Sequence, residues 1–127
     1  RESNPKYYFS DNGLLNLFLD DKNTSLLENA VAVCLTQKYP ADVYYLKSPK
    51  TGIDIDFYAP SAKQVIQVAY SIQGDAYERE TGNLKKFAAT VTEPHSYIIV
   101  TYEEETTIET PDVKIQVVPL MKFLLTK

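Results

Sequence analysis

The sequence has few of the residues on which several common kinds of site depend. It has one cysteine, Cys34, which excludes an internal disulfide and a cysteine-cluster zinc site. Cys34 lies among apolar residues and is expected to pack as a small buried side chain. The one histidine, His95, follows a proline in a predicted turn and is expected at the surface. The four glycines are not spaced as a phosphate-binding loop, so we expect no ATP binding by that route.

Long apolar runs and a strong positive charge are also missing. No run of about 18 apolar residues is present, so no membrane span is predicted. The net charge is −4, and the lysines form only local pairs, Lys47 with Lys50 and Lys85 with Lys86. Duplex DNA binding depends on clustered basic residues, so these pairs are expected to be solvated. With one cysteine and no signal segment, the sequence favours a cytoplasmic protein that makes no membrane contact.

The residues that are present suffice for a single domain covering 1–127. Hydrophobic residues make up 44% of the chain, which is ordinary for a protein with a packed core. The chain begins at Arg1 without a methionine, and residues 1–6 are expected to be a linker from a longer protein.

Hydrophobic periodicity and turn residues predict an alternation of helices and strands. Ile53, Ile55 and Phe57 are expected on one side of their strand. The order predicts an α/β domain whose mixed central sheet has helices on both faces. The expected helices span 14–19, 24–38, 75–91 and 120–125, and the expected strands span 43–47, 53–58, 63–70, 97–102, 106–109 and 113–118.

Three polar residues could form one site on that sheet. Asp56 lies on the polar side of strand 53–58, and Gln67 lies on strand 63–70. If these strands pair as a hairpin, the two residues become neighbours on one face. Glu28, at the edge of the apolar stripe of helix 24–38, can lean toward them. A helix acid, a strand acid and an acid-x-Lys on the next strand form the PD-(D/E)xK nuclease layout, in which carboxylates hold Mg²⁺ and the metal activates water.

The sequence departs from that layout at two positions. Gln67 stands where the acid of acid-x-Lys belongs, and Ala69 stands where the lysine belongs. A neutral amide is a poor Mg²⁺ ligand, and a methyl group cannot offset phosphate charge. Lys47 on the neighbouring strand is the candidate replacement. The site is therefore interpreted as degenerate, with Asp56 and Glu28 as the candidate ligands of any metal and with no confident catalytic residue.

Purely structural roles are the alternative interpretation of the same residues. Glu28 can be the capping-box partner of Ser25 at the start of a helix. Asp54 and Asp56 can be the solvated face of a strand. Gln67, between two apolar neighbours, suggests a hydrogen-bonded polar pocket.

Six segments, in order along the chain, resemble one protein family. The chain is similar to the domain of unknown function that follows the ATPase module in many bacterial and archaeal AAA+ proteins. The resemblance implies a restriction endonuclease-like fold with three layers. It also implies an ATPase module before Arg1, where any ATP would bind. Relatives carry either an acid-x-Lys or a Gln-Val-Ala variant on the third strand. The matching segments are NPKYYFSDNGL (4–14), SLLEN (25–29), GIDIDF (52–57), IQVAYS (66–71), YERE (77–80) and FLL (123–125).

The leading hypothesis is a non-catalytic accessory domain of an AAA+ ATPase that binds a protein or nucleic-acid partner. Asp54, Tyr77 and Lys47 are expected to shape its pocket, and Arg79 is expected to pair with Glu28 or Asp56 in place of a metal. One alternative is an active Mg²⁺-dependent nuclease that uses Glu28, Asp56 and Gln67. Another is a domain through which the parent ATPase oligomerises.

Overall fold

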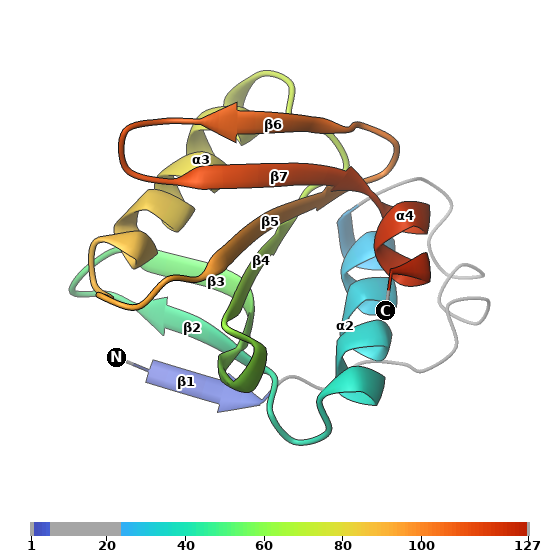
Figure 1. Ribbon diagram of the computed structural model, residues 1–127, viewed down its shortest axis with the longest axis horizontal. Coiled ribbons are helices and arrows are strands. Elements are labelled where there is room, and N and C mark those ends of the chain that lie inside the picture. Colours follow the sequence, from blue (N-terminus) through green and yellow to red (C-terminus); the bar gives the residue numbers. More distant parts are fainter. Residues whose placement is uncertain (1, 6–23, 127) are drawn as a thin grey trace.

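The computed structural model describes residues 2–5 and 24–126 (Figure 1). The predicted helix at 14–19 and most of the first family-like segment lie outside these residues. The strands are β1 (Glu2–Pro5), β2 (Tyr44–Ser48), β3 (Ile53–Ala59), β4 (Gln64–Val68), β5 (Ser96–Thr101), β6 (Thr106–Glu109) and β7 (Lys114–Pro119). The helices are α2 (Thr24–Lys38), the 3-10 turn η1 (Pro60–Ala62), α3 (Asp75–Ala88) and α4 (Leu120–Leu125).

The described strands form one seven-stranded mixed sheet in the order β1-β2-β3-β4-β5-β7-β6. Strands β1 to β4 are antiparallel neighbours, β4, β5 and β7 are parallel, and β6 returns antiparallel to β7. Parallel strands need a crossover, and α3 provides it between β4 and β5. The predicted α/β class and mixed sheet are therefore confirmed.

The sheet begins with a strand that the sequence analysis missed. Residues 1–6 were expected to be a linker, but Glu2–Pro5 forms β1 and pairs antiparallel with β2. The prediction was wrong because the segment has none of the β-branched or aromatic residues by which strands are recognised. An edge strand needs only main-chain pairing on one side, which such residues can supply.

Helices cover both faces of the sheet and define two hydrophobic cores (Figure 1). Helix α3 closes one core, and α2 and α4 close the other. This confirms the predicted layering. The α3 core includes Leu84, Phe87, Val65, Ile99 and Ile115. The α2 core includes Val31, Leu35, Ile66, Val100 and Phe123.

Strand β3 changes faces near its middle. Its register against β2 shifts by one residue between the pairs Tyr44–Tyr58 and Leu46–Ile55. Ile55 consequently packs in the α3 core, whereas Phe57 packs in the α2 core. The prediction that these two side chains share a face was wrong, because one extra residue at a β-bulge reverses the alternation.

The bulge also limits the pairing of β3 with β4. Their register runs from Ala59 opposite Gln64 to Phe57 opposite Ile66. The next residues along the two strands are Asp56 and Gln67. The candidate site therefore lies where the two strands separate.

Two helix limits differ slightly from the prediction. Helix α3 is capped by Gly74, at φ 65°, so Asp75 is its first residue and not its cap. It ends at Ala88, short of the predicted 91. None of the described helices is long and apolar enough to cross a membrane.

Candidate functional site

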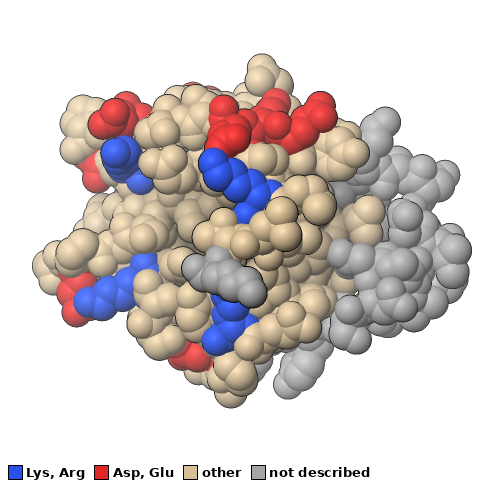
Figure 2. All heavy atoms as spheres, turned by 45° about the vertical axis from the view of Figure 1, so that its right-hand side comes forward, with Lys and Arg blue, Asp and Glu red and all other residues tan. Residues whose placement is uncertain are grey.

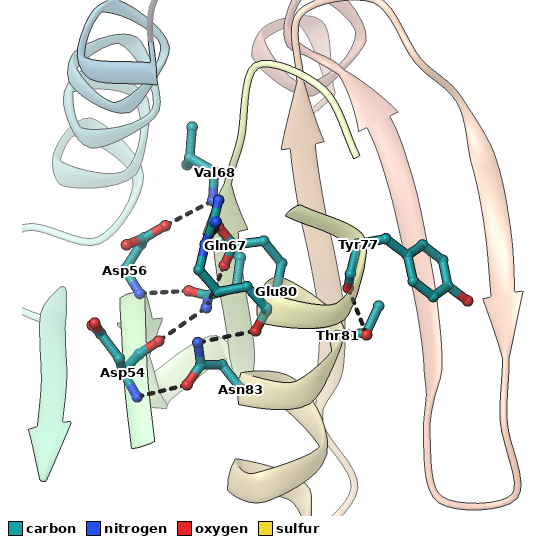
Figure 3. A network of polar contacts seen from close by, with 9 residues as sticks. Asp54, Asp56, Gln67, Val68, Tyr77, Glu80, Thr81 and Asn83 are labelled. Carbon is teal, nitrogen blue, oxygen red and sulfur yellow. Dashed lines mark hydrogen bonds and ion pairs between the residues drawn. The ribbon is translucent and has the colours of Figure 1, made fainter. Parts of the chain in front are cut away.

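The amide of Gln67 lies at the centre of the site (Figure 3). Gln67 is 1% exposed. Its Oε1 accepts a hydrogen bond from the Asp56 backbone N–H at 2.7 Å, and its Nε2 donates to the Asp54 carbonyl oxygen at 2.9 Å. Nε2 also donates to Glu80 Oε1 at 3.0 Å. Both amide hydrogens are therefore used, and the partners fix the orientation of the amide.

The side chain of Asp56 makes a reciprocal contact, from β3 to the backbone of β4. Its Oδ2 accepts from the backbone N–H of Val68 at 2.8 Å. A side chain from each strand thus binds the backbone of the other strand, beyond the point where their regular pairing stops. We call Asp54, Asp56, Gln67 and Val68 the β3–β4 joint. The predicted proximity of Asp56 and Gln67 is confirmed, and the bonds satisfy backbone groups that the bulge removes from the ladder.

Glu80, on α3, supplies a buried carboxylate at this joint. It is 7% exposed, and burial raises the pKa of its carboxyl. The neighbouring Arg79 acts against the rise in pKa, while the charges of Asp54 and Glu28 add to it. The charge of Glu28, on helix α2, is the smallest of these effects on the pKa of Glu80.

Asn83, one turn after Glu80, binds the joint from the same helix. Its Oδ1 accepts from the Asp54 backbone N–H at 3.1 Å, and its Nδ2 donates to the Arg79 carbonyl at 3.1 Å. Sequence reasoning expected the segment 77–80, which ends at Glu80, to help shape the pocket of Asp56, but it did not single out Asn83. The available signal was their spacing of three, which places both beside the buried stripe of Thr81 and Leu84 on α3.

Two predicted pocket residues on α3, Tyr77 and Arg79, are exposed. Tyr77 is 37% exposed, and its ring points away from Gln67 (Figure 3). Its backbone carbonyl accepts from the Thr81 hydroxyl. The Arg79 side chain is 60% exposed, and its Nε lies 3.5 Å from Glu80 Oε2. Arg79 thus pairs with Glu80, whose carboxylate binds Gln67, and its expected pairing with Glu28 or Asp56 stays a prediction.

Among the described contacts of the joint, no lysine takes the place of the one that the nuclease pattern requires. Lys47 is exposed on β2 opposite Asp54, and its side chain makes no hydrogen bond or ion pair with the described residues. Ala69 is buried, and its backbone N–H donates to the Val100 carbonyl.

His95 lies outside the joint and is more enclosed than its turn suggested. It is half-buried, with its ring 5.4 Å from the Phe87 ring centroid and 5.8 Å from that of Tyr58. Nδ1 lies 2.9 Å from the Glu93 carbonyl oxygen, so it carries the proton there, and Nε2 accepts from the Tyr58 hydroxyl. The surface prediction was wrong because these aromatic side chains converge from separate elements. Cys34 packs against the α2 core, close to its expected role.

The polar atoms of the joint fit a metal ion poorly. Gln67 Oε1 faces a backbone N–H, and Asp56 Oδ2 is held by another. Within residues 2–5 and 24–126, no group of three or more His, Cys, Asp and Glu side chains has a metal-binding arrangement. Comparison with protein-family models, curated proteins and solved structures found no significant match.

Proposed function

We propose that this chain is a non-cutting binding module with a restriction endonuclease-like fold, attached to an AAA+ ATPase. The support is positional. A strand acid, Asp56, and Gln67 on β4 meet where β3 and β4 separate, and a half-buried helix acid, Glu28, is among the charges that raise the pKa of Glu80 beside them. That is the order of the nuclease layout, on a mixed sheet with helices on both faces.

The hydrogen bonding of Gln67 is the observation that carries the proposal. In the nuclease layout, this position supplies a carboxylate to Mg²⁺. Here its oxygen is turned onto the Asp56 backbone and its two hydrogens are donated to the Asp54 carbonyl and Glu80. Gln67 links β3 and β4 at the point where their regular pairing ends. The fold therefore keeps the arrangement of the nuclease layout, and these residues act as a structural joint.

The charge around the joint indicates what kind of partner it favours. Asp54 is exposed, Glu28 and Asp56 are half-buried, and all three are acidic, whereas Glu80 is buried and pairs with Arg79. Exposed acidic groups repel phosphates and favour basic groups. We therefore favour a protein partner, such as the ATPase module of the same polypeptide, over nucleic acid.

A cleavage assay tests the proposal against the nuclease alternative. The chain is incubated with supercoiled plasmid and with single-stranded DNA, in Mg²⁺ or Mn²⁺. We expect no cleavage above that of a reaction without the protein. Asp112→Ala, which alters an exposed acid in the turn before β7, is the matched control for Asp56→Ala. Metal-dependent cleavage that Asp56→Ala abolishes and Asp112→Ala retains would overturn the proposal.

A further inference from the structure

A groove opens on the α2 side of the sheet, away from the β3–β4 joint. Helices α2 and α4 cover only part of that face. The uncovered part, formed by β4, β5 and β7, encloses about 460 Å³ beside the end of α2 and helix α4. Figure 2 shows blue basic side chains on different sides of a tan area of the surface. This volume lies in the range of small-molecule sites, about 300 to 1,000 Å³.

The charged side chains that line the groove have one sign. The described lining includes Lys38, Lys114 and Lys122, from α2, β7 and α4, and contains no aspartate or glutamate. On a chain with a net charge of −4, this is a local reversal of charge. Lys122 pairs with Glu105, but Lys38 and Lys114 have no acidic partner among the described residues. Neither ammonium therefore forms an ion pair with a described carboxylate, and Glu109 is the acid opposite Lys114 in the β6–β7 register.

One of these cations is held in place. Lys38 Nζ donates to the Thr126 carbonyl at 2.7 Å and lies 6.0 Å from the centroid of the Phe123 ring. A carbonyl and an aromatic face both orient an ammonium without cancelling its charge. Two of its three hydrogens remain for a ligand.

The floor of the groove is apolar, with amides at its margins. Ile98 and Val118 are half-buried on the parallel strands, and Phe123 lies beside them on α4. Gln116 Oε1 accepts from the Thr107 hydroxyl, which leaves its NH₂ group available. The groove therefore combines a surface for a flat apolar group with fixed positive charge and hydrogen-bond donors.

We propose that this groove binds a small organic anion. Its carboxylate or phosphate faces Lys38 and Lys114, and its flat ring lies on Ile98, Val118 and Phe123. A duplex does not fit a hollow of this size, and the net charge of the chain opposes binding of a long polyanion. The groove is separate from the β3–β4 joint, so the inference goes beyond the proposed function and either one can fail alone.

Backbone amide NMR titrations test this inference with defined probes. Adenosine monophosphate and naphthoate each carry a flat ring and an anionic group, and adenosine and inorganic phosphate each carry one of the two. We expect saturable shifts at Ile98, Gln116 and Val118 with at least one complete anion, and weaker binding of the halves. Binding of the phosphate or of the carboxylate compound identifies which group the site prefers.

Lysine variants test whether binding depends on the lysines of the groove or only on the overall charge of the chain. Lys114→Ala and Lys38→Ala should each weaken binding about tenfold, as expected for one charge-assisted hydrogen bond. Lys114→Arg should retain most of the affinity. Lys50→Ala, in the exposed turn after β2, is the matched control and should bind like the parent chain.

Three results would overturn the inference. The first is the absence of saturable shifts with both complete anions. The second is an equal affinity of the Lys114→Ala and Lys50→Ala variants. The third is binding of an oligothymidylate or a polyglutamate peptide in the groove when neither small anion binds, which would assign it to a macromolecule. The dispersion of each spectrum reports whether the variant is folded, and both substituted lysines are exposed.

Discussion

Gln67 joins two strands through its side chain at a point where their backbones no longer pair. Two of its hydrogen bonds reach backbone groups of β3, and the third reaches the buried carboxylate of Glu80. Leaving a buried polar group without a partner costs about 1–3 kcal/mol. The identity of this residue should therefore affect stability as much as any activity.

Replacement of Gln67 by glutamate tests that dependence. Gln67→Glu keeps the shape but puts an oxygen opposite the Asp54 carbonyl and beside Glu80, where the amide donated hydrogens. We expect the free energy of unfolding to fall by about 2–4 kcal/mol at neutral pH, because a buried charge meets two acceptors. Urea unfolding measures the change, and part of the loss should be recovered in mild acid as the new carboxyl protonates.

Gln116→Glu is the matched control, since Gln116 is exposed and accepts a hydrogen bond from Thr107. It should change stability by less than about 0.5 kcal/mol, as is usual at the surface. A Gln67→Glu variant as stable as this control at neutral pH would contradict the role assigned to Gln67.

Glu80 should make stability depend on pH. Burial raises its pKa in the folded chain, so the folded state binds more protons than the unfolded state between the usual carboxyl pKa and the raised one. The stability that Glu80 contributes is present below this window and is lost as pH rises through the folded pKa. Glu80→Gln should remove this loss of stability, because glutamine does not titrate, and its side-chain oxygen should still accept a hydrogen bond from Gln67. The stability of the variant relative to the parent should therefore increase with pH across the window.

The free energies of unfolding of the parent and of Glu80→Gln, measured from mildly acidic to neutral pH, give this difference. Glu78→Gln, on an exposed position of the same helix, is the control and should leave the pH dependence of the parent unchanged. A Glu80→Gln profile parallel to that of the parent would show that Glu80 titrates as an ordinary carboxyl.

The contact between Asp56 and Gln67 was predictable, whereas the part played by Glu80 was not. A hairpin of two adjacent strands follows from local sequence, and it brings these residues together. Glu80 meets them through the crossover helix, whose rotation over the sheet depends on how Leu84 and Phe87 pack. Local periodicity identifies the buried stripe of a helix but not the polar residue at its edge that will be enclosed.

At the scale of elements, the loop from β4 to α3 is held by one carboxylate. Glu104, in the turn after β5, accepts from the Ile72 backbone N–H at 2.7 Å, the Ser71 hydroxyl at 2.9 Å and the Gln73 amide at 3.3 Å. Desolvation alone would raise the pKa of Glu104, but these hydrogen bonds outweigh it and the pKa lies below its usual range. The clamp thereby fixes the loop that leads from the joint to Glu80.

Removal of that carboxylate should loosen the loop. Glu104→Ala should lower the free energy of unfolding by about 1 kcal/mol, the usual net value of a hydrogen bond, because solvent screens this carboxylate, and should speed hydrogen exchange at Ile72. Because the folded pKa is lowered, this stabilisation is present above the unfolded pKa and is lost as pH falls through the folded one. Glu103→Ala, at the exposed neighbouring position, is the control. Unchanged exchange at Ile72 in Glu104→Ala would contradict the clamp.

Strands with strong alternation were predicted within a few residues, and two features of the sheet were not. Strand β1 carries no hydrophobic signal. The bulge in β3 preserves the alternation of buried and exposed residues while it moves Phe57 to the opposite core from Ile55. A period of two cannot reveal such a change of face, because the extra residue is recognised only from the register of the partner strand.

At the scale of the whole molecule, charges that are distant in sequence gather into separate regions. Lysines 38, 114 and 122 line one groove, whereas Glu28, Asp54 and Glu80 surround the joint. The sequence showed only the short-range lysine pairs at 47–50 and 85–86, and neither pair lines the groove. Such convergence depends on strand order and helix placement, which composition and spacing do not specify.

The central claim is that the third-strand position of the nuclease layout has become a hydrogen-bonded joint. The most direct test is a Mn²⁺ titration that follows the side-chain NH₂ signals of Gln67 by NMR, with Asp56→Asn for comparison. We predict that the two signals stay narrow and protected from exchange at Mn²⁺ concentrations that would saturate a nuclease site. Saturable broadening of these signals and of the Val68 amide, lost in Asp56→Asn, would contradict the claim and place a metal between the strands.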